Sequence, residues 1–355
     1  MKISPKLSQL IKELLKREAT DLHLISDRPA ILRINGGLTF SQDQDIVSSA
    51  IIDNIIETIL NDEQKKRLKE KKDIDLAISF ENKARFRINI YQAMGKYSLA
   101  MRYISNKIRS IEDLHLPPIL HQFARATQGF FLVVGPSGHG KSTALASLLD
   151  EINHTRFDHI ITIEDPIEYV FHSDKCLIEQ REIGVDAKDF HNGLRAMFRE
   201  DADAIMIGEM RDPETISTAL TAAETGHLVL STLHTNTAAE TIDRIITSFP
   251  SHEQAQIKNQ LASTLVGILS RRLLPSTQGG LINAYEILIA NSAIRNLIRE
   301  GKIYQIPSVM ETSSAEGMIT LNRCLADLVK NNLITLDQAE THSTNPAELR
   351  MILQI

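Results

Sequence analysis

The sequence predicts a two-domain α/β protein in which a small α+β domain precedes a larger domain built on a parallel β-sheet. Three observations lead to this prediction. The segment GPSGHGKST at 135–143 has the pattern of a phosphate-binding loop and directly follows the apolar run FFLVV at 130–134. Further apolar runs of strand length alternate with helical segments after this loop, as they do in parallel sheets. Before the loop, the segment 105–120 with Pro117-Pro118 separates two different patterns, and we interpret it as a linker.

Residues 1–104 mix helical and strand-like segments, which predicts the small α+β domain. The clearest strand is 84–91, where apolar residues at even positions alternate with polar residues at odd positions. The sequence AMGK at 93–96 predicts a turn into a second strand, giving a hairpin with one apolar face and one arginine-bearing face. We further expect helices near 4–18 and 45–70, a turn at 34–38, and strands at 20–25, 30–35, 74–80 and 84–92.

Residues 121–355 predict the larger domain. Its apolar runs are short and continuous, which is typical of strands that are buried on both faces of a parallel sheet. From about residue 252 onward the pattern is mostly helical, so we expect the domain to end in helices. The predicted parallel strands are 130–134, 159–163, 204–208 and 227–233.

Composition limits the classes of function. The chain of 355 residues has a formal net charge of −6, and its charged residues are interspersed. A protein that tracks DNA usually carries a basic stripe, so we expect no nucleic-acid partner; the basic run at 65–72 fits the solvated face of a helix. The sequence has two cysteines, Cys176 and Cys324, which lie far apart, so a four-cysteine zinc site is excluded. No apolar stretch approaches the roughly 18 residues of a membrane helix, so we expect no direct membrane insertion.

The loop after the first parallel strand contains the residue types that bind phosphate. Glycines let backbone N–H groups turn toward phosphate oxygens, and the following helix points its positive end at them. Lys141 would neutralise the β- and γ-phosphate oxygens of ATP, and the Ser142 hydroxyl would bind Mg²⁺. We expect His139, a variable position of the pattern, to face solvent. The predicted nucleotide-binding residues are Gly135, Pro136, Ser137, Gly138, His139, Gly140, Lys141, Ser142 and Thr143.

Two carboxylate clusters follow predicted strands downstream of the loop. TIEDPIE supplies Glu164, Asp165 and Glu168, and DAIMIGEMRD supplies Glu209 directly after its strand. Ligands bind at the carboxyl ends of parallel strands. We assign Glu209 to Mg²⁺ and its water, with Glu164 and Asp165 as further metal candidates. Glu168 would orient or deprotonate the attacking water, and the choice of general base between Glu168 and Glu209 stays open.

Two histidines bracket the strand predicted at 227–233. They are His227 and His234 in the string GHLVLSTLHTN. Because this strand is expected beside the strand that precedes the phosphate loop, both histidines are candidates for sensing the γ-phosphate. The alternative is a structural hydrogen-bonding role.

Three longer strings identify a family. TIEDPIE, IGEMRDPETISTALTAAETGHLVLSTLHTN and AIRNLIREGK together resemble the secretion-ATPase superfamily and, within it, the type IV pilus retraction ATPases. The similarity extends from ATDLHL at 19–24 to the last predicted helices. The resemblance implies an N-terminal PAS-like domain, a C-terminal RecA-like ATPase domain, and a homohexameric ring.

The resemblance also implies a role for the arginine-bearing face of the predicted hairpin. In the family, arginines of the RFR hairpin reach the nucleotide bound to a subunit and supply charge to its γ-phosphate. By motif position these are Arg85 and Arg87, with Arg102 on the next strand as a third candidate. Without the resemblance, exposed strand arginines would indicate only a solubilising surface.

The string AIRNLIRE at 293–300 resembles the signature that is linked to pilus retraction in the family. Its spacing alone predicts an amphipathic surface helix with three apolar residues on one face and two arginines on another. The resemblance implies that these residues couple hydrolysis to movement instead of catalysing hydrolysis. The candidates are Arg295, Asn296, Leu297 and Arg299.

The resulting prediction is a cytoplasmic Mg²⁺-dependent ATPase that retracts pili at an inner-membrane pilus platform protein, with a second retraction ATPase as a further candidate partner. Relatives that drive pilus extension or type II secretion typically have a longer N-terminal region and a four-cysteine zinc insertion, which this sequence lacks. An accessory retraction motor and a motor of another secretion system stay open. A nucleic-acid translocase on the same core and a non-catalytic ATP-binding scaffold are the alternatives from other classes.

Overall fold

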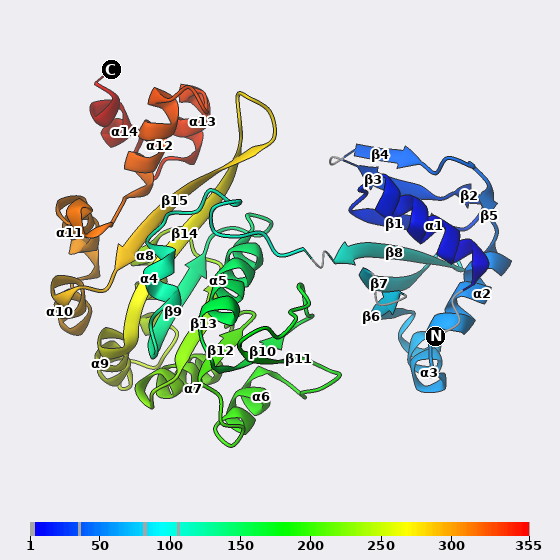
Figure 1. The fold of residues 1–355 in the computed structure, drawn as a ribbon, viewed down its shortest axis with the longest axis horizontal. Helices are drawn as coiled ribbons and strands as arrows, with labels where there is room; N and C mark the ends of the chain where they lie inside the picture. Colours follow the sequence, from blue (N-terminus) through cyan, green and yellow to red (C-terminus); the bar gives the residue numbers. More distant parts are fainter. Residues whose placement is uncertain (1–3, 35–36, 81–83, 105–106, 355) are drawn as a thin grey trace. The chain divides into compact units, whose positions relative to one another are not determined.

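The computed structural model describes residues 4–34, 37–80, 84–104 and 107–354. The chain divides into two compact units, Met1–Lys107 and Ile108–Ile355 (Figure 1). Of the segment predicted as a linker, residues 105–106 lie outside the described residues. Ile111, Leu114 and Leu116 of the same segment are buried in a hydrophobic core of the second unit.

The first unit is a six-stranded antiparallel sheet in the order β4-β3-β1-β8-β7-β6, packed against three helices. Its predicted hairpin is confirmed: the apolar residues of β7 at 84, 86, 88 and 90 are buried. Met94 and Gly95 both have positive φ, as a two-residue hairpin turn requires. The strands are β1 (Asp21–Ile25), β2 (Arg28–Pro29), β3 (Ile31–Ile34), β4 (Gly37–Phe40), β5 (Ile46–Val47), β6 (Asp73–Phe80), β7 (Ala84–Ala93) and β8 (Lys96–Ile104), with β2 and β5 forming a separate pair.

The helical stretch predicted near 45–70 is two helices: Leu60 is extended and ends the first, and Asn61 caps the second. Its Oδ1 accepts from Gln64 N at 2.8 Å, and Gln64 Oε1 accepts from Asn61 N at 3.0 Å. Residues 35–36 of the turn predicted at 34–38 lie outside the described residues, although β3 and β4 pair on either side of them. The helices are α1 (Pro5–Lys16), α2 (Ser49–Ile59) and α3 (Asp62–Lys71).

The second unit is built on a seven-stranded sheet in the order β11-β10-β12-β13-β9-β14-β15. All neighbouring strands are parallel except β14 and β15. The four predicted parallel strands are confirmed as β9, β10, β12 and β13. The strands are β9 (Gly129–Val134), β10 (His159–Glu164), β11 (Leu177–Glu182), β12 (Ala204–Ile207), β13 (Leu228–Leu233), β14 (Leu265–Pro275) and β15 (Leu281–Ile289).

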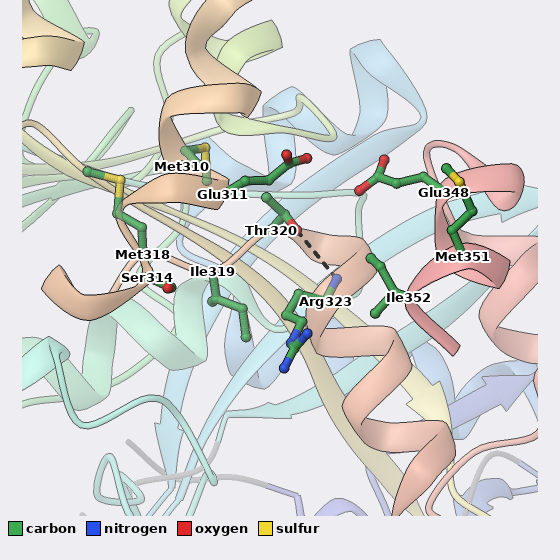
Figure 2. A pocket seen from close by; sticks show the side chains of 10 residues that line it. All are labelled: Met310, Glu311, Ser314, Met318, Ile319, Thr320, Arg323, Glu348, Met351 and Ile352. Atoms are coloured by element: carbon green, nitrogen blue, oxygen red, sulfur yellow. Dashed lines mark hydrogen bonds between the residues drawn. The ribbon is translucent and has the colours of Figure 1, made fainter. Parts of the chain in front are cut away.

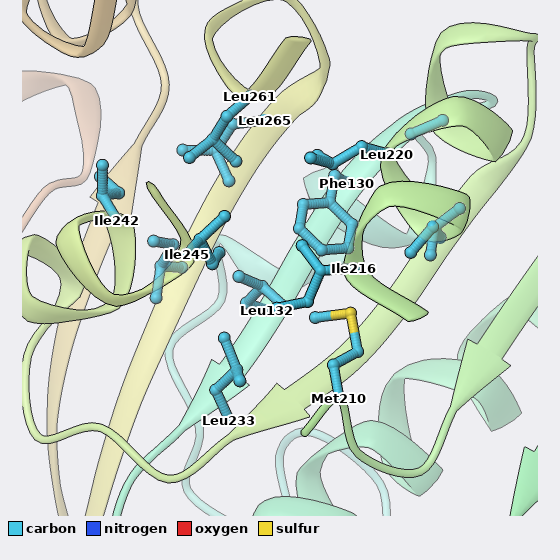
Figure 3. Packing of buried hydrophobic residues seen from close by; sticks show 14 of the residues in the cluster. Phe130, Leu132, Met210, Ile216, Leu220, Leu233, Ile242, Ile245, Leu261 and Leu265 are labelled. Carbon is cyan, nitrogen blue, oxygen red and sulfur yellow. The ribbon is translucent and has the colours of Figure 1, made fainter. Parts of the chain in front are cut away.

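Helices cover both faces of this sheet, so β9 is buried on both sides. Phe130 and Leu132 point into one core, shown in Figure 3 with Ile216 of α7 and Ile245 of α8. The alternate residue Phe131 points into the other core, which α4 and α5 close. The helices are α4 (Leu120–Ala124), α5 (Lys141–Thr155), α6 (Phe190–Met197), α7 (Pro213–Glu224), α8 (Ala238–Thr247), α9 (Gln254–Thr264), α10 (Ser292–Glu300), α11 (Ile306–Thr312), α12 (Leu321–Lys330), α13 (Leu336–His342) and α14 (Pro346–Leu353), with 3₁₀ turns at Ile303–Gln305 and Ser314–Glu316.

The prediction of a mostly helical region after residue 252 is wrong for β14 and β15. These two long strands extend the sheet beyond β9, and Gly279 and Gly280, both with positive φ, lie in the turn between them. Buried and partly exposed residues follow one another irregularly along β14 and β15. Their sequences therefore show neither the alternation of a half-buried strand nor the continuous apolar run of a fully buried one.

The C-terminal helices pack at the end of the β14–β15 ribbon. A cavity of about 550 Å³ lies between α11 and the helices α12 and α14, lined by methionines at 310, 318 and 351. The carboxylates of Glu311 and Glu348 face one another across it (Figure 2). Across the described residues, no helix combines the length and apolarity needed to cross a bilayer.

Glu286 on β15 makes folding stability depend on pH. It is buried, and its Oε1 accepts from Ala238 N, at the start of α8, at 2.6 Å. Burial raises the pKa of Glu286 to about 6. Because this pKa lies above the unfolded value, ionisation opposes folding, and stability is lost as pH rises from about 4.5 through 6. Relative to Glu286→Gln, we expect the wild type to lose about 2 kcal/mol between pH 4.5 and 7.5, measured by urea unfolding. A stability difference that does not change with pH would contradict this assignment.

Candidate active site

The parallel strands β9 to β13 of the second unit end at one edge of the sheet, and most of the predicted site residues follow these ends. Val134 pairs with Leu233, so the loop after β9 lies beside the chain that leaves β13. β10 and β12 are paired in register and end at the same edge. β14 pairs with β9 as far as Ser270 opposite Val134 and then continues past the loop. The edge therefore gathers several segments that are distant in the sequence.

The phosphate loop joins β9 to α5, as the sequence predicts. β9 ends at Val134 and α5 begins at Lys141, with Gly140 as its N-cap in the left-handed conformation. The first turn of α5 has no side-chain cap, so its N–H groups are free of a capping side chain and available for a ligand. This is the local structure that binds phosphate at a helix N-terminus.

Lys141 is buried inside its own loop, with 8% of its surface exposed. Its Nζ donates to the carbonyl oxygens of Gly135 at 2.9 Å and Pro136 at 3.0 Å. Burial lowers the pKa of Lys141, while the negative charges of Glu209 and Glu168 oppose this effect. The ammonium group is thus held by the loop, and the charges of both predicted catalytic carboxylates act on it.

His234 links Lys141 to Glu209. Its Nδ1 lies 3.4 Å from Lys141 Nζ and 3.4 Å from Ser137 Oγ, and its Nε2 lies 3.4 Å from Glu209 Oε2. A lysine ammonium only donates, so Nδ1 accepts, and Nε2 then carries the ring proton and faces the carboxylate as a donor. A change at the phosphate loop can therefore reach Glu209 through one imidazole ring. The sensing role of His234 stays a prediction.

Glu209 follows β12 after a single residue, Gly208, and its side chain is mostly buried. One carboxylate oxygen pairs with Arg211, whose side chain is exposed, and the other faces His234. The carboxylate therefore lies at the sheet edge between an exposed arginine and an imidazole ring.

Glu164, the last residue of β10, is buried and engaged within the chain. Its oxygens accept from Thr162 Oγ1 at 2.8 Å, Gln180 Nε2 at 3.0 Å and Glu168 N at 3.3 Å. Burial raises the pKa of Glu164 to about 7, against the effect of these hydrogen bonds. This arrangement fixes the turn that carries Glu168, whereas Asp165 and Glu168 themselves are exposed. The metal roles of Glu164 and Asp165 stay predictions.

The prediction that His227 senses the γ-phosphate is wrong for the phosphate loop of its own chain. Leu228 pairs with Gly129, so His227 lies at the end of β13 opposite to the phosphate loop. Six strand residues, roughly 20 Å, separate the two ends. His227 Nδ1 donates to Ala222 O at 2.9 Å and its ring packs edge-on against Phe198, which is the structural alternative.

His139 is half-buried and does not simply face solvent. Its Nδ1 accepts from Leu273 N on β14 at 2.9 Å. The expectation differs from the structure because β14, which lies against the loop, is itself a strand that the sequence pattern does not reveal.

Two residues near the loop are absent from the sequence-based prediction. Arg271 on β14 donates to the carbonyl oxygen of Gly140, and the Tyr169 hydroxyl lies 2.8 Å from Thr143 Oγ1. The signal for Arg271 is an arginine inside the apolar string ILSRRLL, which becomes informative only once that string is known to be a strand.

In the first unit, the predicted finger arginines share the sheet face opposite the buried residues of β7. Arg87 pairs directly with Arg102 across β7 and β8, and Arg85 lies two residues before Arg87 on the same face. Arg102 Nε lies 2.8 Å from Asp21 Oδ1. Like charges directly opposite one another destabilise a sheet, and Asp21 beside Arg102 and Asp75, 4.0 Å from Arg87 Nε, offset part of this repulsion.

The AIRNLIRE string forms α10, and its apolar residues are buried as predicted. Arg295, however, is not on a free surface. Its Nη1 donates to Ala262 O and Ser263 O, both at 2.6 Å, and its Nε donates to Ala290 O at 2.8 Å. It thereby ties α10 to the end of α9, which leads directly into β14. Arg299 is exposed, Leu297 is buried, and Asn296 donates to Glu300 at 2.8 Å.

Comparison with known proteins places this site in a family. The model of the type II/IV secretion system protein family matches residues 1–320. The chain belongs to this family. The type IV pilus retraction ATPase PilT of Pseudomonas aeruginosa is 40% identical over 340 residues, covering 96% of this chain and 98% of PilT. The type IV pilus ATPase PilU of the same organism is 31% identical, covering 98% of this chain and 91% of PilU.

A solved structure agrees with the family assignment. The crystal structure of the pilus retraction motor PilT with bound ADP superimposes with a TM-score of 0.92 at 43% identity, covering 97% of this chain and 98% of that one. The α/β architecture predicted from the sequence is therefore that of a type II/IV secretion family ATPase.

Proposed function

We propose that the chain is a Mg²⁺-dependent motor ATPase that powers type IV pilus retraction. The observation that carries the ATPase activity is the contact chain from Lys141 through His234 to Glu209 at the phosphate loop. It joins a phosphate-binding cation to a carboxylate that follows β12, two strands away from β9 in the sheet. The retraction role is supported by the 40% identity to PilT and by the string that forms α10.

Ser142 and Glu209 suit magnesium. Mg²⁺ takes oxygen ligands, keeps several waters, and binds through one or two protein groups plus substrate phosphates. Ser142 offers a hydroxyl in the first turn of α5, and Glu209 offers a carboxylate at the same sheet edge. The bound ion would neutralise charge on the β- and γ-phosphate oxygens.

The chain's own groups would act on ATP and on the attacking water. Lys141 and the N–H groups of α5 would bind the phosphates. His234 contacts both Lys141 and Glu209, so a shift of Lys141 on phosphate binding would change the surroundings of Glu209. Glu168 is exposed on a turn that Glu164 fixes, so we assign it to orienting the water, with Glu209 as the alternative base.

The active unit is proposed to be a ring of six copies docked on a pilus platform protein at the cytoplasmic face of the inner membrane. Arg85 and Arg87 of one copy would complete the nucleotide site of another, with Arg102 held beside them by Asp21. A carboxylate-rich site of one chain would then hydrolyse ATP only when a second copy supplies the cations.

The two arginines of α10 are expected to differ in effect. Arg295→Ala removes three hydrogen bonds from a charged group to carbonyl oxygens, so we expect a loss of about 2 kcal/mol in unfolding free energy. Arg299→Ala should change stability by less than about 0.5 kcal/mol, since the side chain is exposed. Both variants are expected to keep ATPase activity and to lose pilus shortening. Urea unfolding, ATP turnover and imaging of pili measure the three quantities. Loss of turnover in Arg299→Ala would refute a coupling role separate from hydrolysis.

Deleting the gene and imaging pili tests the retraction function. Excess surface pili without twitching supports a primary retraction motor, whereas cells without pili would indicate an extension motor. Twitching that persists with reduced force would indicate an accessory motor, as the similarity to PilU allows. ATP turnover stimulated by DNA or RNA would instead favour a translocase.

A further inference from the structure

Arg271 on β14 touches both ends of the phosphate loop. Its side chain is buried, and its Nη1 donates to Gly140 O at 2.5 Å. A Cβ on Gly140 would lie 2.7 Å from this Nη1, and a Cβ on Gly135 would lie 2.3 Å from the Arg271 carbonyl oxygen. The loop therefore begins and ends against one residue, and both glycines leave room for it.

Asn283 fixes the guanidinium of Arg271. Arg271 Nε donates to Asn283 Oδ1 on β15 at 2.7 Å, and Asn283 Nδ2 donates to Leu114 O. Because both ends of the amide are engaged, it cannot flip without losing both hydrogen bonds. The position of the Gly140 carbonyl is thus set by β14, β15 and the segment before α4.

The charge of Arg271 acts on the peptide that opens α5. Its two acceptors, an amide and a peptide carbonyl, are neutral. Burial and then the like charge of Arg109 lower the pKa of Arg271 to about 10, and it stays a cation at neutral pH. The Gly140 carbonyl shares its peptide with the Lys141 N–H. A cation on that carbonyl polarises the peptide and strengthens the N–H as a donor. N–H groups at this helix start are what the loop presents to a phosphate.

We propose that Arg271, held by Asn283, is a positioning residue of the phosphate site, which fixes Gly140 and polarises its peptide so that the loop binds the diphosphate of a nucleotide more tightly. The inference rests on the proposed ATPase function. Arg271 acts through the Gly140–Lys141 peptide, which supports the bound nucleotide and the transition state alike. Its loss therefore raises KM and weakens ADP binding more than it lowers kcat.

Calorimetric titration of the full chain with ADP and with inorganic pyrophosphate tests this role. Arg271→Gln is expected to raise the Kd of both ligands by about tenfold, because one charged hydrogen bond is lost from the loop they share. In steady-state ATPase assays KM should rise by about the same factor, with kcat changed less than about threefold. Pyrophosphate lacks a base and ribose, so a parallel loss for both ligands assigns the effect to the phosphate loop.

Arg272→Gln is the matched control. Arg272 is the next residue of the same strand, and its Nη1 donates to His342 O at 2.5 Å, whereas Arg271 donates to the loop. Its replacement should leave the Kd for ADP within about twofold of wild type. An equal loss of affinity in Arg272→Gln would mean general damage to β14 and would overturn the proposal. Unchanged ADP affinity in Arg271→Gln would overturn it as well.

Asn283→Ala keeps the proposal testable if Arg271→Gln does not fold. We expect this variant to weaken ADP binding about threefold, and the double variant to bind ADP no more weakly than Arg271→Gln alone, because both act through one contact. Wild-type affinity in a folded Asn283→Ala variant would contradict the proposed link. A wild-type chain that binds neither ligand would refute the ATPase function itself, which distinguishes the two failures.

Discussion

Lys141→Ala is expected to lower ATP turnover by at least about a thousandfold, or about 4 kcal/mol of transition-state stabilisation. The ammonium group is the cation that the loop itself holds, through Gly135 O and Pro136 O. No other side chain can supply its charge from inside the loop, and His234 loses one of its three contacts there. Turnover of purified protein at saturating ATP measures the effect.

Lys188→Ala is the control for the loss of one positive charge. Lys188 is an exposed lysine of the same unit, in the loop before α6, so its removal should leave turnover within about twofold of wild type. Thermal unfolding of Lys141→Ala separates lost chemistry from lost structure. Wild-type turnover in a folded Lys141→Ala variant would refute the assignment of residues 135–143 as the phosphate site.

Local sequence patterns predict the parts of this fold whose neighbours are also local. The phosphate loop, the four parallel strands and the hairpin that begins at residue 84 each carry their own periodicity or motif, and the structure has them where the pattern places them. Glu209 follows the same logic, since a carboxylate directly after a buried strand must lie at the sheet edge.

The elements and contacts that the sequence did not predict are those whose surroundings are formed by residues far away in the sequence. β14 lies between β9 and β15, so its side chains meet different surroundings from one residue to the next. Without β14 in place, neither the hydrogen bond that holds His139 nor the contact from Arg271 to Gly140 can be foreseen. His227 failed for a simpler reason: it precedes a strand that runs parallel to β9, so it lies at the amino end of that strand, away from the loop that follows β9.

Alanine at both Arg85 and Arg87 is expected to lower kcat by about 10³ to 10⁵, while the Kd for ADP stays within about threefold. This range corresponds to roughly 4 to 7 kcal/mol of activation free energy. The physical reason is that a finger arginine neutralises charge that develops on the γ-phosphate, which ADP lacks. Arg67→Ala/Lys69→Ala removes two exposed cations from α3 of the same unit and should leave kcat unchanged within about twofold.

Mixing variants distinguishes fingers that act across copies from fingers that act within one chain. Glu168→Ala retains the arginines, and Arg85→Ala/Arg87→Ala retains Glu168, so each is inactive alone for a different reason. In a ring whose sites are completed by another copy, a random equal mixture rebuilds about one quarter of the sites, because both contributors must be intact. Turnover that recovers to that level after mixing, and not when either variant is mixed with Lys141→Ala/Arg85→Ala/Arg87→Ala, supports completion across copies. A mixture as inactive as its components would place each finger with its own chain's nucleotide or remove it from catalysis. Recovered turnover would also explain how hydrolysis is coupled to motion. No copy could hydrolyse ATP before another copy had moved its arginine-bearing sheet to the nucleotide.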